Sequence, residues 1–148
     1  MPRVTVLMPT YNVAPWVEEA IQSVLNQTHR DFELLVVDDG STDNTLDHVR
    51  SIQDDRIRIA AFPDNVGLAE NLNRGLDLIG TELVARMDGD DIAEPDWLET
   101  GINVLDTHPE VGICSFGFQF FGTKTSLVRF PEHNEDSKAQ MLFGCTDS

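Results

Sequence analysis

The chain has 148 residues, of which 41% are hydrophobic and 24% are charged, and this composition suits one globular domain with a hydrophobic core. Its 26 Asp and Glu residues outnumber its 10 Lys and Arg residues, which gives a formal net charge of -16. Because a surface that follows phosphate groups needs clustered Lys and Arg, this charge argues against nucleic acid or an anionic membrane as a partner, and it favours a divalent cation.

The first part of the sequence alternates short apolar runs with segments of helical period. A strand is predicted over 4–8, closed by a turn over 9–12, and a second strand is predicted over 32–37. After each strand a helix is predicted, because apolar residues recur at helical spacing. These residues are Trp16, Val17, Ala20, Ile21, Val24 and Leu25 in the first helix, and Leu46, Val49 and Ile52 in the second.

The same alternation continues to about residue 109. It predicts, in order, a strand over 57–61, a helix with Leu68, Leu72, Leu76 and Ile79 on one face, a strand over 83–87, and a helix from Pro95 to His108. Beyond it, short strands are predicted over 111–116, 118–121 and 127–130, and a last helix over about 137–143.

The apolar runs and the cysteines indicate where the protein works. No apolar run approaches the length of a membrane span, and the two cysteines, Cys114 and Cys145, form no metal-binding pattern. We therefore expect a cytoplasmic protein with reduced thiols and no membrane-spanning segment in this chain.

Strands that alternate with helices predict an α/β fold with a mostly parallel central sheet and helices on both faces. In such sheets, ligands bind outside the carboxyl ends of the strands. Three polar clusters fall at predicted strand ends: Thr10-Tyr11-Asn12, Asp38-Asp39-Gly40-Ser41 and Asp88-Gly89-Asp90-Asp91. The sequence therefore predicts a ligand site at this edge of the sheet.

The third cluster places three carboxylates within four residues, directly after an apolar strand. Carboxylates this close repel one another unless a cation or a set of hydrogen-bond donors faces them. An EF-hand loop does not explain the cluster, because its glycine stands second rather than sixth. The alternatives at this point are a metal site and a solvated acidic turn between a strand and a helix.

Five motifs stand in a characteristic order, and the sequence resembles the nucleotide-sugar-binding part of family 2 glycosyltransferases, which have the GT-A fold. The resemblance covers about residues 3 to 110. The motifs are Pro9-Thr-Tyr-Asn12, Gln27-Thr-His-Arg-Asp-Phe-Glu33, Val37-Asp-Asp-Gly-Ser-Thr-Asp43, Asn65-Val-Gly-Leu-Ala69 with Asn73-Arg-Gly75, and Ala85-Arg-Met-Asp-Gly-Asp-Asp-Ile92.

The resemblance implies a Rossmann-like, three-layer α/β/α domain over residues 1–148. It also implies an inverting, metal-dependent enzyme that transfers a sugar from a UDP- or dTDP-type donor to a saccharide or lipid-linked acceptor that the sequence does not identify. The implied nucleotide-binding residues are Pro9, Thr10, Tyr11, Asn12, Asp39, Gly67, Asn71, Asp88 and Gly89. The implied ligands of Mg²⁺ or Mn²⁺ are Asp90, Asp88 and Asp91.

Individual roles also follow from the resemblance. Tyr11 would stack on the base, and Asp39 would accept a hydrogen bond from the imide of uracil or thymine. A plain turn carboxylate is the alternative role for Asp39, and Asp38 and Asp43 are placed equally well for the turn. The sequence departs from many relatives at Leu72, where they carry an arginine, and neither Arg74 nor Arg86 is assigned to the phosphates.

The implied reaction also needs a carboxylate base that deprotonates the acceptor hydroxyl. In the family this base lies well after the acidic cluster. We expect it beyond Ser148, with Glu132 and Asp136 as the candidates inside this chain, so that the chain would be the donor-binding half of a longer enzyme.

Three other functions stay open at this point. One is a non-catalytic module that binds a nucleotide sugar or a metal. A nucleotidyltransferase-like enzyme is the second, although it would need a Gly-rich, Lys- or Arg-bearing loop near the first strand. The third is a response-regulator receiver, which would need an acidic pair where Pro9-Thr10-Tyr11 stands.

Overall fold

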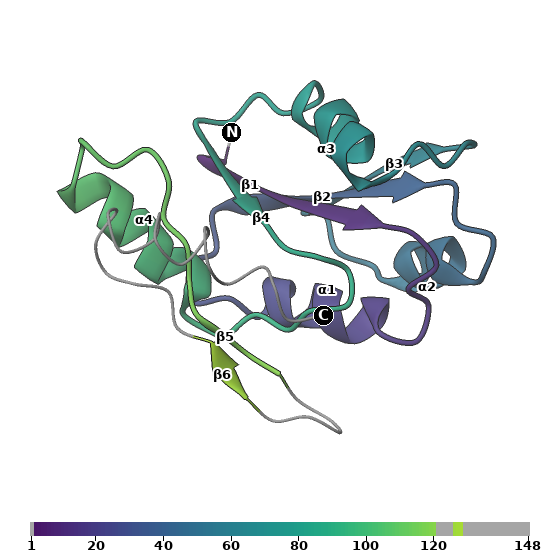
Figure 1. The fold of residues 1–148 in the computed structure, drawn as a ribbon, viewed down its shortest axis with the longest axis horizontal. Coiled ribbons are helices and arrows are strands. Elements are labelled where there is room, and N and C mark those ends of the chain that lie inside the picture. The colour runs from purple at the N-terminus through teal and green to yellow at the C-terminus, as the bar shows by residue number, and fades with distance from the viewer. Residues whose placement is uncertain (1, 121–125, 129–148) are drawn as a thin grey trace, which may run out of the picture. The chain divides into compact units, whose positions relative to one another are not determined.

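The computed structural model describes residues 2–120 and 126–128. The chain divides into two compact units, Met1–Ile102 and Asn103–Ser148, and each is described by itself. The first unit contains four parallel strands, β1 (Val4–Thr10), β2 (Phe32–Asp39), β3 (Ile57–Phe62) and β4 (Leu83–Arg86), in the spatial order β3-β2-β1-β4 (Figure 1). This sheet confirms the predicted α/β fold.

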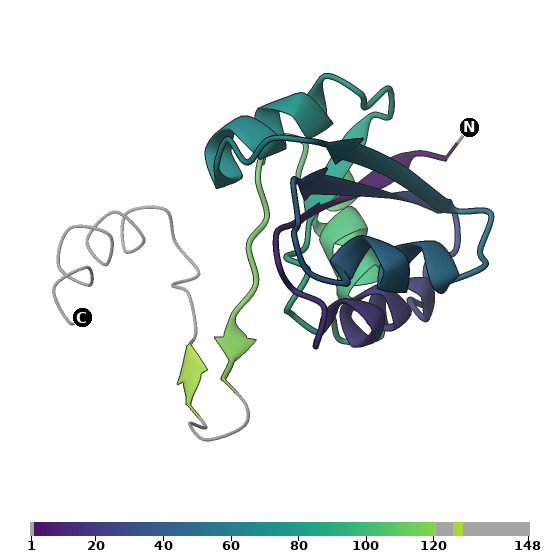
Figure 2. The same cartoon turned by 90° about the vertical axis from the view of Figure 1, so that its right-hand side faces the viewer.

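Helices cover both faces of the sheet. Helices α1 (Val17–Leu25) and α2 (Thr45–Ser51) lie on one face and α3 (Leu68–Leu76) lies on the other, as the edge-on view of Figure 2 shows. The reason is the strand order: the chain moves from β1 to β2 to β3 in one direction and then returns past β1 to β4. Right-handed crossovers that run in opposite directions place their helices on opposite faces of a sheet. Helix α3, in the crossover from β3 back to β4, therefore lies on the face opposite α1 and α2. Helix α4 (Trp97–Thr107) follows β4.

Each of the two central strands faces two cores. Alternate side chains of β1 and β2, among them Val6, Met8, Leu34 and Val36, pack with Ile21 and other residues of α1 and α2. The side chains between them form a second cluster under α3: Leu7, Leu35 and Val37, with Leu72 and Ile79 packed against it. Every residue of β1 is buried, as expected for a central parallel strand covered on both faces.

The predicted turn over 9–12 begins two residues too early, since β1 continues through Pro9 and Thr10. The Leu7 carbonyl accepts a hydrogen bond from the Met87 amide, so odd-numbered residues of β1 direct their backbone polar groups toward β4. The strand pairing with β4 ends at Leu7, opposite Arg86. Pro9 therefore costs the sheet no hydrogen bond, and proline is tolerated there.

The predicted apolar face of α3 is wrong in part. Leu68 and Leu76 are exposed, and the buried positions of the helix are Asn71 and Gly75. A Cβ atom at Gly75 would lie 2.5 Å from Leu7 Cδ1, so the glycine lets the helix backbone come close to the sheet. This close approach turns the two leucines away from the core.

The second unit contains a short antiparallel pair, β5 (Phe118–Gln119) with β6 (Leu127–Val128), which confirms the strands predicted over 118–121 and 127–130 where these ranges are described. The strand predicted over 111–116 is wrong: these residues form no strand, and Ile113 is 87% exposed. A short apolar run becomes a strand only where another strand pairs with it. The helix predicted over 137–143 lies outside the described residues.

Candidate functional site

The carboxyl ends of the four strands meet at one edge of the sheet, where the strand order reverses. Thr10 stands beside Asp38, Asp39 stands beside Phe62, and Arg86 stands beside Leu7. The chain leaves β1 toward β2 and later returns on the other side of β1 to β4, so the strand order reverses between β1 and β4. Ligands of open α/β sheets bind at such a switch point.

The loop after β1 is fastened to the loop after β2 by Asn12. Its Oδ1 accepts hydrogen bonds from the amides of Thr42 at 2.8 Å and Asp43 at 3.3 Å, and its own amide donates to Ser41 Oγ at 3.0 Å. Asn12 has a φ of 54°, a left-handed conformation that asparagine adopts more readily than most residues. In the structure Asn12 thus shapes the edge, while Tyr11 beside it is 46% exposed at the end of β1.

The neighbouring carboxylates Asp38 and Asp39 have different partners. Asp38 is fully buried and accepts hydrogen bonds from Thr10 Oγ1 at 3.1 Å and from the Ser41 amide at 2.9 Å. Asp39 accepts hydrogen bonds from the amides of Val66 at 3.0 Å and Gly67 at 2.8 Å, in the loop after β3. Of the two, Asp38 is therefore the carboxylate that holds the turn after β2, and Asp39 holds the next loop.

Asp43 is a third carboxylate that holds a loop. Burial alone would raise its pKa, yet hydrogen bonds from the hydroxyl and amide of Thr45 and from the Ala14 amide bring the pKa below its ordinary value. Asp43 is therefore a charged fastener between the loops after β1 and β2.

The start of α3 lies against Asp39. Gly67 has a φ of 88° and directs its amide at the Asp39 carboxylate. Asn71 donates from Nδ2 to the Val37 carbonyl at 2.9 Å, while its Oδ1 is buried without a hydrogen-bond partner. Arg74, one turn further on, lies over the Phe62 ring with its NH1 3.8 Å from Asp39 Oδ1. Gly67 thus binds Asp39 directly, and Asn71 binds the same strand at Val37.

Residues 88–91, which follow β4 and are called the acidic loop below, contact the loop after β1 at Gly89. A Cβ atom at Gly89 would lie 2.9 Å from Thr10 Cγ2 and 3.2 Å from Val13 Cγ2, so no larger residue fits without displacing one of the two loops. The Pro9 carbonyl is also close, at 3.4 Å. The two loops are therefore in close contact at Pro9, Thr10 and Gly89.

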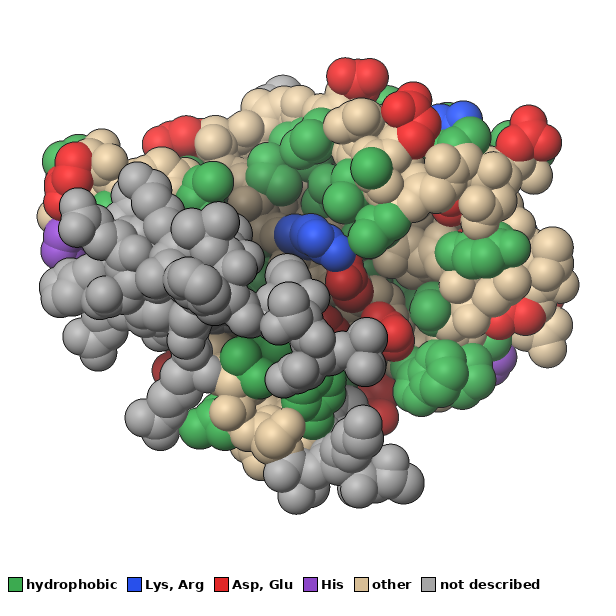
Figure 3. Space-filling view, viewed as in Figure 1, with side chains coloured by type: hydrophobic (Ala, Val, Ile, Leu, Met, Phe, Trp, Pro, Cys, Tyr) green, Lys and Arg blue, Asp and Glu red, His purple; other side chains and the backbone are tan. Residues whose placement is uncertain are grey.

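The three carboxylates of the acidic loop do not converge. Asp88 pairs with Arg86, and Figure 3 shows acidic side chains gathered beside a basic one on this face. Burial raises the pKa of the Asp91 carboxyl, and the negative charges of Asp90 and Asp88 raise it further, against the opposing charge of Arg86. Within residues 2–120 and 126–128, no three His, Cys, Asp or Glu side chains are grouped to hold a metal ion.

The chemistry of these donors nevertheless fits a hard divalent cation. Carboxylate oxygens are the ligands that Mg²⁺ and Mn²⁺ prefer, and three such groups stand within four residues here. Asp90 and Asp91 are the donors at hand, while Asp88 would first have to leave Arg86.

Two residues that the sequence did not single out anchor the acidic loop to α1. Gln27 is fully buried: its Nε2 donates to the Glu94 carbonyl at 2.6 Å, and its Oε1 accepts from the Leu98 amide at 2.9 Å. Ser23 Oγ accepts from the Ala93 amide at 3.0 Å. The sequence contained one sign of this role: Gln27 follows an apolar helix closely and begins one of the five motifs. Arg86 was also left without a role.

The candidate base residues cannot be placed at this site. Glu132 and Asp136 both lie outside the described residues.

In the described part of the chain, no helix is long and apolar enough to cross a membrane.

Comparisons with known proteins identify relatives of this chain. The model of the family described as "Glycosyl transferase family 2" matches residues 5–144. An uncharacterized glycosyltransferase of Haemophilus influenzae is 39% identical over 112 residues, which are 74% of this chain and 35% of that protein.

Two solved structures share the fold. Residues 1-349 of TarS of S. aureus, in complex with UDP-GlcNAc, superpose with a TM-score of 0.67 at 29% identity, over 72% of this chain and 32% of that one. The mannosyltransferase PcManGT of Pyrobaculum calidifontis, in complex with GDP-Man and Mn²⁺, gives 0.66 at 31% identity, over 78% of this chain and 34% of PcManGT. The chain thus spans about a third of the length of these matched chains. With the family match over nearly all of its length, the chain belongs to glycosyl transferase family 2.

Proposed function

We propose that this chain binds a nucleotide-diphosphate sugar at the switch point between β1 and β4 and serves the transfer of that sugar to an acceptor. The observation that carries the proposal is the convergence of Tyr11, Asp39 and the acidic loop 88–91 at one sheet edge. Complexes of TarS with UDP-GlcNAc and of PcManGT with GDP-Man support the class of ligand.

The base is proposed to be an imide-bearing pyrimidine, as in UDP or dTDP. Tyr11 offers an exposed ring for stacking. Asp39 is buried and already accepts hydrogen bonds from the amides of Val66 and Gly67, so the N–H of the base would use a remaining carboxylate lone pair. Cytosine and adenine present an acceptor where uracil and thymine present the imide N–H. Guanine also carries a ring N–H, so GDP is the informative competitor.

We also propose that Mg²⁺ or Mn²⁺ binds at Asp90 and Asp91, with Asp88 directed to the ribose or the metal. When bound, the cation neutralises negative charge that develops on the leaving diphosphate. The residues of the chain hold the nucleotide in place: Asn12 and Asp38 fix the loops, and Gly89 sets their separation.

The proposed reaction is a direct displacement with inversion, in which a carboxylate base takes the proton of the acceptor hydroxyl. Glu132 and Asp136 stay candidates for this base, as does a residue beyond Ser148. The proposed location is the cytoplasm, where thiols such as that of Cys114 stay reduced.

A thermal-shift panel with UDP, dTDP, GDP and ADP, each with and without Mn²⁺, tests the proposal. UDP or dTDP with Mn²⁺ at about 100 times the dissociation constant should stabilise the fold by about 2.7 kcal/mol, or about 5–10 °C. A larger shift with GDP would overturn the choice of base, and an equal shift with ADP would indicate nonspecific binding.

The variant Asp90→Asn should lose the Mn²⁺-dependent part of the shift. Its melting temperature without ligand should be equal or higher, because the substitution relieves repulsion within the acidic loop. Asp96→Asn removes the same charge from the same connection, between β4 and α4, and is the matched control. If Asp90→Asn unfolds the protein, Asp90 has a structural role and the metal assignment fails.

A further inference from the structure

Arg86 holds Asp88 by two hydrogen bonds. The Nε of Arg86 donates to Oδ1 of Asp88 at 3.0 Å, and NH2 donates to Oδ2 at 2.9 Å. Both oxygens of the carboxylate thus face the fork of a single guanidinium, the geometry in which arginine and a carboxylate bind most specifically. Arg86 is the last residue of β4, so the pair stands at the start of the acidic loop.

This pair explains why three neighbouring carboxylates do not form one group. Residues 87–96 contain five acidic residues and no lysine or arginine. Arg86 lies directly before them and turns Asp88 toward itself, away from a shared position with Asp90 and Asp91. The guanidinium occupies one lone pair on each Asp88 oxygen, and its positive charge opposes a metal ion at the lone pairs that remain.

We propose that Arg86 is an internal counter-ion of the acidic loop that competes with the divalent metal for Asp88. This inference rests on the metal site of the proposed function. Without nucleotide, Arg86 lowers the affinity of the loop for free metal. With nucleotide, the diphosphate brings negative charge that can pair with the released guanidinium, so Arg86 makes metal binding depend on nucleotide binding.

Binding of Mn²⁺ alone, measured by electron paramagnetic resonance of the free ion, tests this inference directly. Arg86→Gln should bind Mn²⁺ about three- to tenfold more tightly than the wild type, because a carboxylate is freed and a positive charge is removed. Arg86→Lys keeps the charge but loses the fork, so its affinity should lie between the two.

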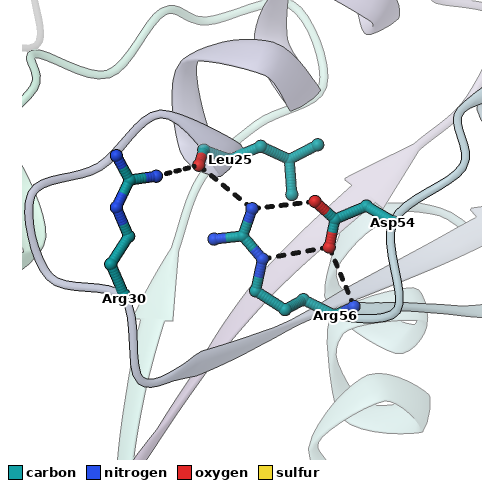
Figure 4. A network of polar contacts seen from close by, with 4 residues as sticks. All are labelled: Leu25, Arg30, Asp54 and Arg56. Atoms are coloured by element: carbon teal, nitrogen blue, oxygen red, sulfur yellow. Dashed lines mark hydrogen bonds and ion pairs between the residues drawn. The ribbon is translucent and has the colours of Figure 1, made fainter.

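Two control variants separate this effect from a general change of charge. Arg50→Gln removes one positive charge from the exposed surface of α2. Arg56→Gln breaks another bidentate pair of the same spacing, in which Nε and NH2 of Arg56 donate to Asp54 at 3.0 and 2.8 Å (Figure 4). This pair directly precedes β3, at the opposite end of the parallel strands from the acidic loop. Neither control should change the affinity for Mn²⁺ by more than about twofold.

A double-mutant cycle with Asp88→Asn shows whether Arg86 acts through Asp88. In the Asp88→Asn background, Arg86→Gln should raise the Mn²⁺ affinity much less than in the wild type, since there is no carboxylate left to free. UDP should also increase the Mn²⁺ affinity of the wild type by a larger factor than that of Arg86→Gln.

The outcomes distinguish this inference from the proposed function. If Mn²⁺ binds the wild type together with UDP but Arg86→Gln binds free Mn²⁺ equally or more weakly, the competition is overturned while the metal site stands. If no variant binds Mn²⁺, with or without UDP, the metal site itself is wrong and the competition falls with it. Circular dichroism of each variant confirms that the compared proteins are folded.

Discussion

Single residues at this sheet edge receive different roles because strand geometry directs neighbours to opposite faces. Asp38 has the same parity as Leu34 and Val36, which face α1, and Asp39 has the parity of Leu35 and Val37, which face α3. Side chains alternate with a period of two along a strand, so adjacent carboxylates cannot share a partner here. This alternation is why Asp38 fixes the turn after β2 while Asp39 contacts the start of α3.

Asp54, at the amino ends of the strands, should make the unfolding free energy of the protein depend on pH in the acid range. Asp54 accepts hydrogen bonds from Nε, NH2 and the amide of Arg56, and Arg56 also donates to the Leu25 carbonyl, as does Arg30 (Figure 4). The side-chain hydrogen bonds from Arg56, together with that from its backbone amide, lower the pKa of Asp54 from 3.8 to about 2.

We predict that Asp54→Asn destabilises the protein by about 1–2 kcal/mol near pH 7, a range reduced from the full pKa shift because Asp54 is 24% exposed and screened by solvent. A lowered pKa in the folded state stabilises the fold above the ordinary pKa of 3.8, and this contribution is lost as the pH falls through about 2. Urea unfolding at several pH values should therefore show the gap between the two proteins narrowing below pH 4. Asp55→Asn, at the exposed neighbour, is the control; a gap independent of pH would contradict the prediction.

At the scale of elements, the acidic loop depends on α1 for its position. Gln27 and Ser23 bind backbone groups at three positions in the stretch from Ala93 to Leu98. The Thr28 amide adds a hydrogen bond to the Pro95 carbonyl at 2.8 Å. The loop that carries the proposed metal ligands is thereby fastened on its far side, after Asp91, to a helix that itself packs on the sheet.

We predict that Gln27→Ala costs about 2–3 kcal/mol, because it leaves the buried Leu98 amide and Glu94 carbonyl without their partner. Gln22→Ala, at an exposed position of α1, should change the unfolding free energy by less than about 0.5 kcal/mol. Urea unfolding measures both. Nucleotide affinity of Gln27→Ala should fall as well, since the acidic loop loses its anchor; a fully stable variant would show that the amide contacts are dispensable.

At the scale of the molecule, the reversal of strand order determines where the candidate site lies. The excess of negative charge lowers the stability of the folded state. The chain has 26 acidic residues against 10 basic ones, so repulsion acts over most of the surface. The chain also spans only about a third of the length of the relatives described above.

We predict that raising NaCl from about 20 to about 200 mM increases the melting temperature, because screening weakens net repulsion more than it weakens the few close ion pairs. Potassium chloride at equal ionic strength should act alike, which excludes a specific effect of sodium. A decrease would show that ion pairs such as Arg56–Asp54 dominate the electrostatics. The result also sets the ionic strength at which Mn²⁺-specific shifts must be compared.

The sequence by itself determined the order of elements from β1 to α4, the parallel sheet and the edge at which the polar clusters gather. These features follow from local information: the period of apolar residues distinguishes strands from helices, and the carboxyl ends of parallel strands share one edge. The prediction of the strands that became β1 to β4 was confirmed to within two residues at each end. Membership of the family could likewise be expected from five short motifs.

Only the tertiary structure decided which partners these residues have. Three findings depend on segments that are far apart in the chain. Pro9 extends β1, Gly75 lets α3 approach the sheet closely, and Gln27 anchors the acidic loop. The pairing of Arg86 with Asp88 spans only two residues, yet the sequence allowed each to turn elsewhere. Local patterns determine where the backbone goes, whereas the partner of a polar side chain depends on which groups the folded chain brings within hydrogen-bonding distance.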